Sequence, residues 1–305
     1  MENVIIIGSG PAGLTAAVYT ARGNLEPLPI TGNELGGQIA TTTDVENFPG
    51  FPEGVTGPEL YDLLWRQAER FGTRQEIDEV IDVNMRRRPF VVKTHGGEFQ
   101  ARALILATGA SPRKLGIPGE AEFLGRGVSY CATCDGFFFR NKEIIVVGGG
   151  DSALQEALFL TKFAAKVHVV HRRDQLRAGA TLQDRASKNE KIDFIWNAVP
   201  VEVLGDGAVQ GVRLQNVKTG EVSVKPVDGM FVYIGHYPNT RLYEDQLDMD
   251  HEGYLVVDAR LHTNVAGVFA AGEVHDRVFR QAVVSAGYGC MAAMEAEKYV
   301  ASLDD

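Results

Sequence analysis

Apolar runs that end in glycine recur along this chain and predict buried parallel strands. Residues 4–7 are four consecutive β-branched residues, and residues 143–147 hold a second such run. Continuous apolar runs of this length are typical of strands that are covered on both faces of a sheet. A stretch rich in alanine and leucine follows each run and predicts a helix, starting near Leu14 and near Leu154.

The rest of the chain repeats this alternation. Residues 58–71 place their apolar side chains on one face and predict an amphipathic helix, and a last helix is expected over residues 280–299. Strands that alternate with helices in this way predict an α/β fold with parallel sheets. Further strands are predicted at residues 28–30, 103–107, 166–170, 230–234 and 267–271.

Two glycine-rich turns connect a predicted strand to a predicted helix. They read GSGPAG at residues 8–13 and GGGDSA at residues 148–153. Glycines at these spacings permit a tight turn and let backbone N–H groups approach a pyrophosphate, which the positive end of the helix dipole attracts. One such turn could be an ordinary glycine-rich connection, but two in this context favour two dinucleotide-binding sites.

Basic residues follow the strand that comes after the second turn. His171, Arg172 and Arg173 end that strand, and Arg177 stands four residues further along. An NAD site would place an acidic residue here for the ribose 2′-hydroxyl, whereas an NADP site places arginine. Because a guanidinium group can bind phosphate through two hydrogen bonds, the pattern favours NADP over a merely solvated basic helix start.

Cys131 and Cys134 form a CxxC motif that is followed by Asp135. Such a pair can close into a disulfide and open to a dithiol, with the adjacent carboxyl group as a candidate acid–base. The alternative is half of a zinc site, but a closed site needs four nitrogen or sulfur ligands and only Cys290 remains. The redox role is therefore favoured. Three phenylalanines at residues 137–139 are expected in the core or as a cover over the cysteines.

Composition narrows the class of protein. The 305 residues carry a formal net charge of −10, and 45% of them are hydrophobic. An acidic chain argues against nucleic acid or an anionic membrane as the main partner. No run of about 20 apolar residues predicts a membrane span, and the N-terminus reads as a strand instead of a signal peptide. Three cysteines do not make a secreted disulfide framework, so a cytoplasmic location is expected.

The order of the motifs predicts that one domain is inserted into another. Residues 111–120 hold two prolines and two glycines and are expected to form the crossover into the second domain. The first domain is predicted to comprise residues 1–113 and 246–305. The second, residues 114–245, then carries both the second glycine turn and the CxxC motif.

Together these motifs resemble a known family over the whole chain. GSGPAG, TTTDVENFPG, ATGASPR, CATCDGFF, GGGDSA, HRRD, IGHYPNT and RQAVVSAGYGCMAA, in this order, are similar to the low-molecular-weight thioredoxin reductases. The resemblance implies an α/β protein with two Rossmann-like, three-layer domains, the second inserted into the first. It also implies FAD in the discontinuous domain, NADPH in the inserted domain, a thioredoxin as partner, and a homodimer.

The resemblance assigns residues to each cofactor by motif position. For NADPH it implies Gly148, Gly150, Ser152, Ala153, His171, Arg172, Arg173 and Arg177. For FAD it implies Gly8, Gly10, Ala12, Gly13, Thr31, Gly32, Gly36, Gly37, Gln38, Asn47, Gly109, Glu273, Arg280, Gln281 and Ala282. Two positions depart from the family: Glu273 stands where an aspartate is usual, and Tyr288 replaces a small residue.

The resemblance further implies that hydride passes from NADPH to FAD and that electrons then reach the Cys131–Cys134 disulfide. Cys134 would lie nearer the flavin, Cys131 would attack the partner disulfide, and Asp135 would serve as acid–base. Because the cysteines and the nicotinamide site share one domain, that domain is expected to swing about connectors near residues 112–116 and 242–247.

Two other functions remain open at this point. The same flavin–disulfide core could use another electron donor, such as ferredoxin, or act on a small dithiol or disulfide. More remotely, the chain could be a flavin-binding protein without catalytic activity, with a metal on Cys131 and Cys134.

Overall fold

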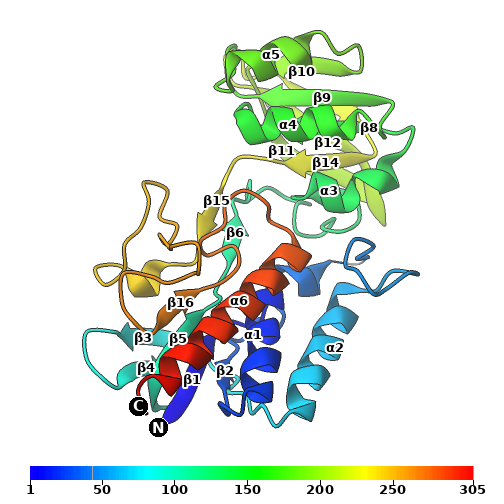
Figure 1. Ribbon diagram of the computed structural model, residues 1–305. Coiled ribbons are helices and arrows are strands. Elements are labelled where there is room, and N and C mark those ends of the chain that lie inside the picture. The colour runs from blue at the N-terminus through cyan, green and yellow to red at the C-terminus, as the bar shows by residue number, and fades with distance from the viewer. Residues whose placement is uncertain (43, 305) are drawn as a thin grey trace. The chain divides into compact units, whose positions relative to one another are not determined.

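The structure is a computed structural model that describes residues 1–42 and 44–304 (Figure 1). The chain divides into two compact units. The split unit comprises Met1–Ser111 and Tyr237–Asp305, and the inserted unit comprises Pro112–His236. The predicted α/β class, with one dinucleotide-binding fold inserted into another, is confirmed.

The crossings between the units lie earlier in the chain than the boundaries expected after residues 113 and 245. Both crossings run through one two-stranded sheet, β6 (Ala110–Pro112) paired with β15 (His236–Pro238). Tyr243, which follows this sheet, is fully buried and packs in the core of the split unit. The segment near residues 242–247, where the second connector was expected, therefore belongs to the packed core of the split unit.

The split unit is built on a mixed six-stranded sheet. The strands are β2 (Leu28–Ile30), β1 (Glu2–Ile7), β5 (Glu98–Leu106), β4 (Phe90–Thr94), β3 (Val80–Asn84) and β16 (Val268–Ala270). β1 pairs in parallel with β2 and β5, and β16 pairs in parallel with β5. The remaining pairs, β5 with β4 and β4 with β3, are antiparallel.

Helices α1 (Pro11–Arg22) and α6 (Ala282–Ala301) cover one face of this sheet and run side by side. Small residues permit this packing: a Cβ atom on Gly289 would lie 2.1 Å from the carbonyl oxygen of Ala12. The opposite face packs on the segment around Tyr243. The unit also contains α2 (Gly57–Arg70) and the short 3₁₀ helices η1 (Gly37–Thr41) and η3 (Arg241–Tyr243).

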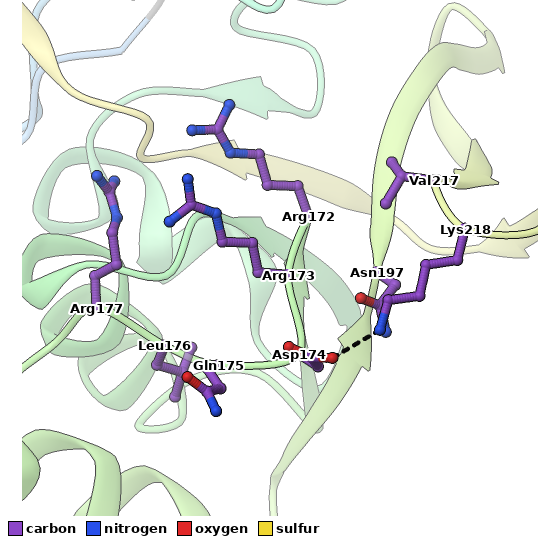
Figure 2. Close-up of a pocket in the computed structure, with 9 residues that line it drawn as sticks. All are labelled: Arg172, Arg173, Asp174, Gln175, Leu176, Arg177, Asn197, Val217 and Lys218. Atoms are coloured by element: carbon purple, nitrogen blue, oxygen red, sulfur yellow. Dashed lines mark hydrogen bonds and ion pairs between the residues drawn. The ribbon is translucent and has the colours of Figure 1, made fainter.

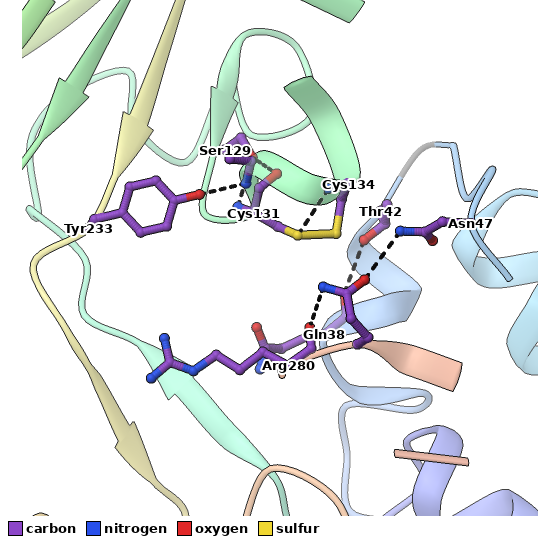
Figure 3. The surroundings of a disulfide bond; sticks show 10 residues. Gln38, Thr42, Asn47, Ser129, Cys131, Cys134, Tyr233 and Arg280 are labelled. Atoms are coloured by element: carbon purple, nitrogen blue, oxygen red, sulfur yellow. Dashed lines mark hydrogen bonds between the residues drawn. A yellow bond between two sulfur atoms is a disulfide. The ribbon is translucent and has the colours of Figure 1, made fainter. Parts of the chain in front are cut away.

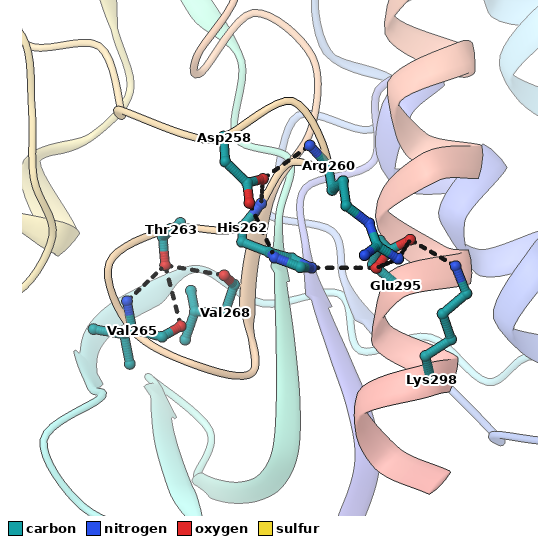
Figure 4. Close-up of polar contacts among 8 residues, drawn as sticks. All are labelled: Asp258, Arg260, His262, Thr263, Val265, Val268, Glu295 and Lys298. Carbon is teal, nitrogen blue, oxygen red and sulfur yellow. Dashed lines mark hydrogen bonds and ion pairs between the residues drawn. The ribbon is translucent and has the colours of Figure 1, made fainter. Parts of the chain in front are cut away.

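A polar cluster fixes α6 to the segment that leads into β16 (Figure 4). Glu295 on α6 is largely buried and accepts hydrogen bonds from Arg260 at 3.0 Å and Lys298 at 2.8 Å. His262 Nε2 lies 3.2 Å from the same carboxylate. The hydrogen bond from Lys298, above all, lowers the pKa of Glu295. The cluster therefore fixes the position of α6, the helix that begins directly after Gln281.

The inserted unit has three layers. A parallel sheet lies between helices on one face and a three-stranded antiparallel sheet on the other. The parallel strands, in sheet order, are β10 (Ile192–Trp196), β9 (Lys166–His171), β8 (Glu143–Val147), β14 (Gly229–Val232) and β7 (Val128–Ser129). The antiparallel strands are β11 (Ala198–Asp206), β12 (Ala208–Asn216) and β13 (Val222–Pro226). The helices are α3 (Ala132–Asp135), η2 (Gly136–Phe139), α4 (Asp151–Leu160) and α5 (Ala180–Ser187).

The predicted helices differ from the observed ones only at their ends. The helix expected to start near Leu154 begins at Asp151 and ends at Leu160, and the last helix, expected over residues 280–299, spans Ala282–Ala301. None of the helices that the structure describes combines the length and the apolar character that crossing a membrane requires.

Candidate functional site

The first glycine turn joins β1 to α1 in the split unit. Gly8 has a φ of +115°, and a Cβ atom there would lie 2.2 Å from the carbonyl oxygen of Ala107 at the end of β5. A Cβ atom on Gly13 would lie 2.0 Å from the carbonyl oxygen of Gly8. The turn is therefore packed directly on the sheet and on its own helix. No side chain caps α1, so the amides of its first turn can bind an anion.

Ser9 ties this turn to the two segments that follow in the sequence. Its hydroxyl donates to the carbonyl oxygen of Thr31 at 3.0 Å and accepts from the Gly36 amide at 3.0 Å. The amide of Gly8 also donates to the carbonyl oxygen of Ile30 at 2.9 Å. The structure thus gathers the predicted residues from Gly8 to Gly13, Thr31 and Gly36 at the carboxyl end of β1 and β2.

Glu273 lies in the split unit beside Gln38 and Arg280. The Gln38 amide donates to its carboxylate at 3.1 Å. Burial raises the pKa of Glu273, and the nearby Arg280 opposes that shift. At the start of α6, the Asn47 amide donates to the Gln281 side chain at 3.3 Å. Predicted residues from three separate stretches therefore meet in one polar cluster.

Tyr288, the second departure from the family, contacts a histidine of its own unit. Its ring packs edge-on against His275, with 4.6 Å between the ring centres. Burial lowers the pKa of His275. Tyr288 also packs against the hydrophobic core between α1 and α6. Its side chain, larger than the residue usual in the family, is therefore partly buried in this core.

The second glycine turn joins β8 to α4 in the inserted unit. A Cβ atom on Gly149 would lie 2.4 Å from Nδ1 of His171. The carbonyl oxygen of Gly149 accepts hydrogen bonds from the amides of Arg177 at 2.7 Å and Ala178 at 3.2 Å. The glycine turn is thus hydrogen-bonded to the basic segment, residues 171–177. Like α1, α4 begins without a side-chain cap.

A basic cavity of about 300 Å³ lies next to this turn (Figure 2). The three predicted arginines, Arg172, Arg173 and Arg177, all line it. Arginine side chains that converge on one concave site provide paired donors for a phosphate group. The other lining residues are Asp174, Gln175, Leu176, Asn197, Val217 and Lys218.

His171 does not line this cavity. Its ring is buried beneath Gly149, and its Nε2 atom lies 3.1 Å from the carbonyl oxygen of Gln175. Burial, more than any other cause, lowers its pKa. The imidazole is therefore neutral at pH 7 and supports the turn, while the arginines supply the charge.

Cys131 and Cys134 form a disulfide, with 5.3 Å between their Cα atoms (Figure 3). Hydrogen bonds fix the backbone at this motif. The Cys131 amide donates to the Ser129 hydroxyl at 3.0 Å, and the Ala132 amide donates to the Tyr233 hydroxyl at 2.5 Å. The Asp135 amide donates to the carbonyl oxygen of Cys131 at 3.1 Å, so α3 presents both sulfurs on one short turn.

A buried carboxylate holds the segment that leads into this motif. Glu120 accepts hydrogen bonds from the amides of Leu115 at 2.8 Å and Gly116 at 2.7 Å, and from the Tyr130 hydroxyl at 2.8 Å. Burial is the main cause of the raised pKa of Tyr130. Tyr130 immediately precedes Cys131, so Glu120 ties the start of the inserted unit to the disulfide.

The three phenylalanines after the motif divide between surface and core. Phe139 is buried and packs edge-on against Phe231, with 5.1 Å between ring centres. Phe137 and Phe138 are 47% and 39% exposed, and the guanidinium of Arg140 lies 4.4 Å from the centre of the Phe137 ring. The disulfide therefore has an exposed aromatic pair on the next turn of the chain.

Sequence reasoning missed Ser129, Tyr233, Glu120, Asn197 and Lys218. Tyr233, Asn197 and Lys218 reach the site only through the fold. Ser129 and Glu120 are close to the CxxC motif in the sequence but belong to no motif that would have identified them. Among the residues that the structure describes, no group of three or more histidine, cysteine and carboxylate side chains could hold a metal ion.

Comparison with known proteins supports the architecture and the chemistry together. The sequence model of the pyridine nucleotide-disulphide oxidoreductase family matches residues 2–289. A thioredoxin reductase of Streptomyces coelicolor is 53% identical over 308 residues, covering 100% of this chain and 96% of that protein. A bifunctional thioredoxin reductase/thioredoxin of Mycobacterium leprae is 53% identical over 304 residues, covering 99% of this chain and 66% of that protein.

A solved structure agrees with these sequence relationships. The crystal structure of thioredoxin reductase from Streptococcus pyogenes superimposes with a TM-score of 0.95 at 44% identity, covering 99% of each chain. The glycine turns, the disulfide and the full-length matches lead to one conclusion. The chain belongs to the pyridine nucleotide-disulphide oxidoreductase family, and its sequence and structure are similar to those of thioredoxin reductases.

Proposed function

We propose that this protein is an NADPH-dependent flavoenzyme that reduces the disulfide of a thioredoxin or a thioredoxin-like protein, acting in the cytoplasm as a homodimer. The observation that carries the proposal is the Cys131–Cys134 disulfide, which one unit holds together with a nucleotide turn and an arginine-lined cavity. The names of the relatives support the choice of partner, and one of them joins reductase and thioredoxin in a single protein. The test is NADPH-driven formation of thiols on a purified thioredoxin, compared with NADH.

The electrons balance across the proposed reaction. NADPH gives up a hydride, which carries two electrons, and the Cys131–Cys134 disulfide takes up two electrons and two protons to become a dithiol. FAD, when bound, supplies the two-electron relay between nicotinamide and disulfide. The Cys131 thiolate attacks the partner disulfide, Cys134 then resolves the mixed disulfide, and the partner leaves with two thiols. Asp135 holds and returns the proton at the cysteine sulfurs.

The split unit has the features that an FAD site requires. The glycine turn leaves no room for a side chain at Gly8 or at Gly13, and the uncapped amides of α1 suit a pyrophosphate. The polar cluster of Gln38, Glu273 and Arg280 offers donors and an acceptor to the rest of the cofactor. These residues, with Thr31, Gly36, Asn47 and the others assigned to FAD above, would hold it.

The arginine-lined cavity predicts a strong preference for NADPH over NADH. Glutamine in place of Arg173 is expected to raise KM for NADPH by about 10- to 100-fold, because a hydrogen bond between charged groups is lost. KM for NADH should stay within about twofold, since NADH has no 2′-phosphate. Steady-state rates of flavin-dependent disulfide reduction with each donor would check this. Equal changes for both donors would contradict a phosphate-binding role.

The exposed aromatic pair next to the disulfide predicts a docking surface for a protein partner. Alanine in place of Phe137 is expected to raise KM for thioredoxin about tenfold, because an exposed aromatic ring that becomes buried contributes one to two kcal/mol, roughly. The rate of flavin reduction by NADPH should not change. Alanine in place of Val222, which is 49% exposed on β13 of the same unit, is the matched control. If both variants behaved alike, docking at Phe137 would be excluded.

The disulfide and the arginine-lined cavity belong to one unit, so the disulfide and a dinucleotide bound at that cavity must both exchange electrons with the same flavin. We therefore propose that the inserted unit turns during the cycle about the two crossings in β6 and β15. These strands pair with each other, and on the inserted side the Arg113 amide donates to the carbonyl oxygen of Gly235 at 2.9 Å. Because the two connections between the units pair with each other, both can bend at the same position when the inserted unit turns.

A further inference from the structure

One carboxylate lies in the arginine-lined cavity. Asp174 lines it together with Arg172, Arg173 and Arg177, although a negative charge at this place repels a phosphate. The same cavity has a fourth cation, Lys218, whose Nζ atom lies 2.7 Å from the Asp174 carboxylate. Figure 2 shows this pair joined by a dashed line, while the three guanidinium groups extend toward another side of the cavity.

The fold brings Lys218 to Asp174 from a distant part of the chain. Lys218 belongs to the turn between β12 and β13, where the Asn216 side chain accepts hydrogen bonds from the Lys218 amide at 2.9 Å and the Thr219 amide at 3.1 Å. The Val217 amide donates to the carbonyl oxygen of Asn197 at 2.7 Å, and the Asn197 amide donates to the carbonyl oxygen of Arg173 at 3.3 Å. Backbone hydrogen bonds therefore fasten this turn to the basic segment.

The Asp174–Lys218 pair adds little to stability. Its side chains are 61% and 60% exposed, and exposed ion pairs contribute little to the free energy of folding. Its consequence for the cavity is larger, because a ligand there meets three unopposed arginines only while Asp174 is neutralised. The hydrogen bond from Lys218, as the largest cause, lowers the pKa of Asp174, so the carboxylate carries a negative charge at neutral pH.

We propose that Lys218 is a positioning residue for donor selectivity: it neutralises Asp174 and so keeps the cavity attractive to the 2′-phosphate of a phosphorylated dinucleotide. This inference rests on the proposed function, in which the arginines bind that phosphate. Lys218 acts through Asp174 and makes no contact of its own with the phosphate. Loss of the lysine leaves an unopposed carboxylate among the arginines, and loss of both groups leaves the arginines as they were.

Binding of nucleotide fragments to the flavin-loaded, full-length protein tests the proposal without turnover. Adenosine 2′,5′-bisphosphate carries the 2′-phosphate and adenosine 5′-monophosphate lacks it. Their dissociation constants are measured by calorimetry for Lys218→Gln, Asp174→Asn, the double variant and Lys218→Arg. Lys188→Gln is the matched control, because Lys188 forms an exposed ion pair with Asp184 on the same unit at 2.8 Å and does not line the cavity.

Lys218→Gln is expected to weaken binding of the bisphosphate about fivefold, the effect of one uncompensated charge at a water-exposed site. Binding of the monophosphate should change much less. The double variant and Lys218→Arg should bind the bisphosphate within about twofold of wild type, and Lys188→Gln should be unchanged. The loss in Lys218→Gln should shrink at high salt, because the repulsion is screened.

Three other results would contradict the proposal. A double variant as weak as Lys218→Gln would overturn the proposal, because the lysine would then contact the phosphate directly. Unchanged binding by Lys218→Gln would overturn it as well. If wild type itself showed no preference for the bisphosphate, the NADPH assignment would fail and this inference with it. A wild type that prefers the bisphosphate, with an inert Lys218, would leave the proposed function standing and refute this inference alone.

Discussion

Serine in place of Cys131 or of Cys134 is expected to abolish reduction of the partner, lowering its rate by about a thousandfold or more. The physical reason is that a hydroxyl group cannot form or open a disulfide, so electrons cannot leave the flavin by this route. Reduction of the bound flavin by NADPH should remain in both variants. Rapid-mixing absorbance of the flavin and counting of thiols on thioredoxin measure the two steps separately.

The two cysteine variants should differ in one respect. With Cys134 replaced, Cys131 can still attack the partner disulfide, and the mixed disulfide accumulates because no second thiol resolves it. With Cys131 replaced, no such adduct should form under the same conditions. Serine in place of Cys290, which lies half-buried on α6 and takes no part in a disulfide, is the control and should retain activity. An adduct only with the Cys131 variant would reverse the roles of the two sulfurs.

Alanine in place of Gly13 is expected to prevent the split unit from retaining FAD. The added Cβ atom would lie 2.0 Å from the carbonyl oxygen of Gly8, so the glycine turn and α1 would have to move apart. Such overpacking costs about 1 to 3 kcal/mol and displaces the amides that suit a pyrophosphate. The flavin content of the purified protein and its thermal unfolding measure the two effects.

Alanine in place of Gly97 is the matched control for this variant. Gly97 belongs to the same unit, lies in the connection between β4 and β5, and has no atom within 4 Å of an added Cβ. This variant should bind flavin as the wild type does. A Gly13→Ala protein with full flavin content and unchanged unfolding would show that the turn does not hold the cofactor.

Local sequence patterns were enough to predict both glycine turns and the helices after them. A strand buried on both faces is a continuous apolar run, and a close approach of the backbone at its end requires glycine. Both features lie next to each other in the sequence, so they can be recognised without knowledge of distant contacts. The CxxC motif was recognised in the same way. The packing of Gly8 against Ala107 and of Gly149 against His171 shows why glycine stands at these positions.

The parts of the site that depend on long-range contacts could not be predicted. Tyr233 reaches the Ala132 amide across 101 residues, and Lys218 reaches Asp174 across 44. The sequence also grouped His171 with the three arginines as a basic residue. Burial lowers the pKa of His171, and its ring supports the glycine turn instead. The second crossing was placed too late because nothing local shows that Tyr243 is buried in the split unit.

The most direct test of the proposed electron path is an anaerobic titration of the purified, flavin-loaded protein with NADPH in the presence of oxidised thioredoxin. The account predicts that each NADPH consumed produces two thiols on thioredoxin, that NADH is a far poorer donor, and that thiol formation stops when Cys131 or Cys134 is serine. Oxidation of NADPH without thiols on the partner, or thiols that still form in the serine variants, would contradict it.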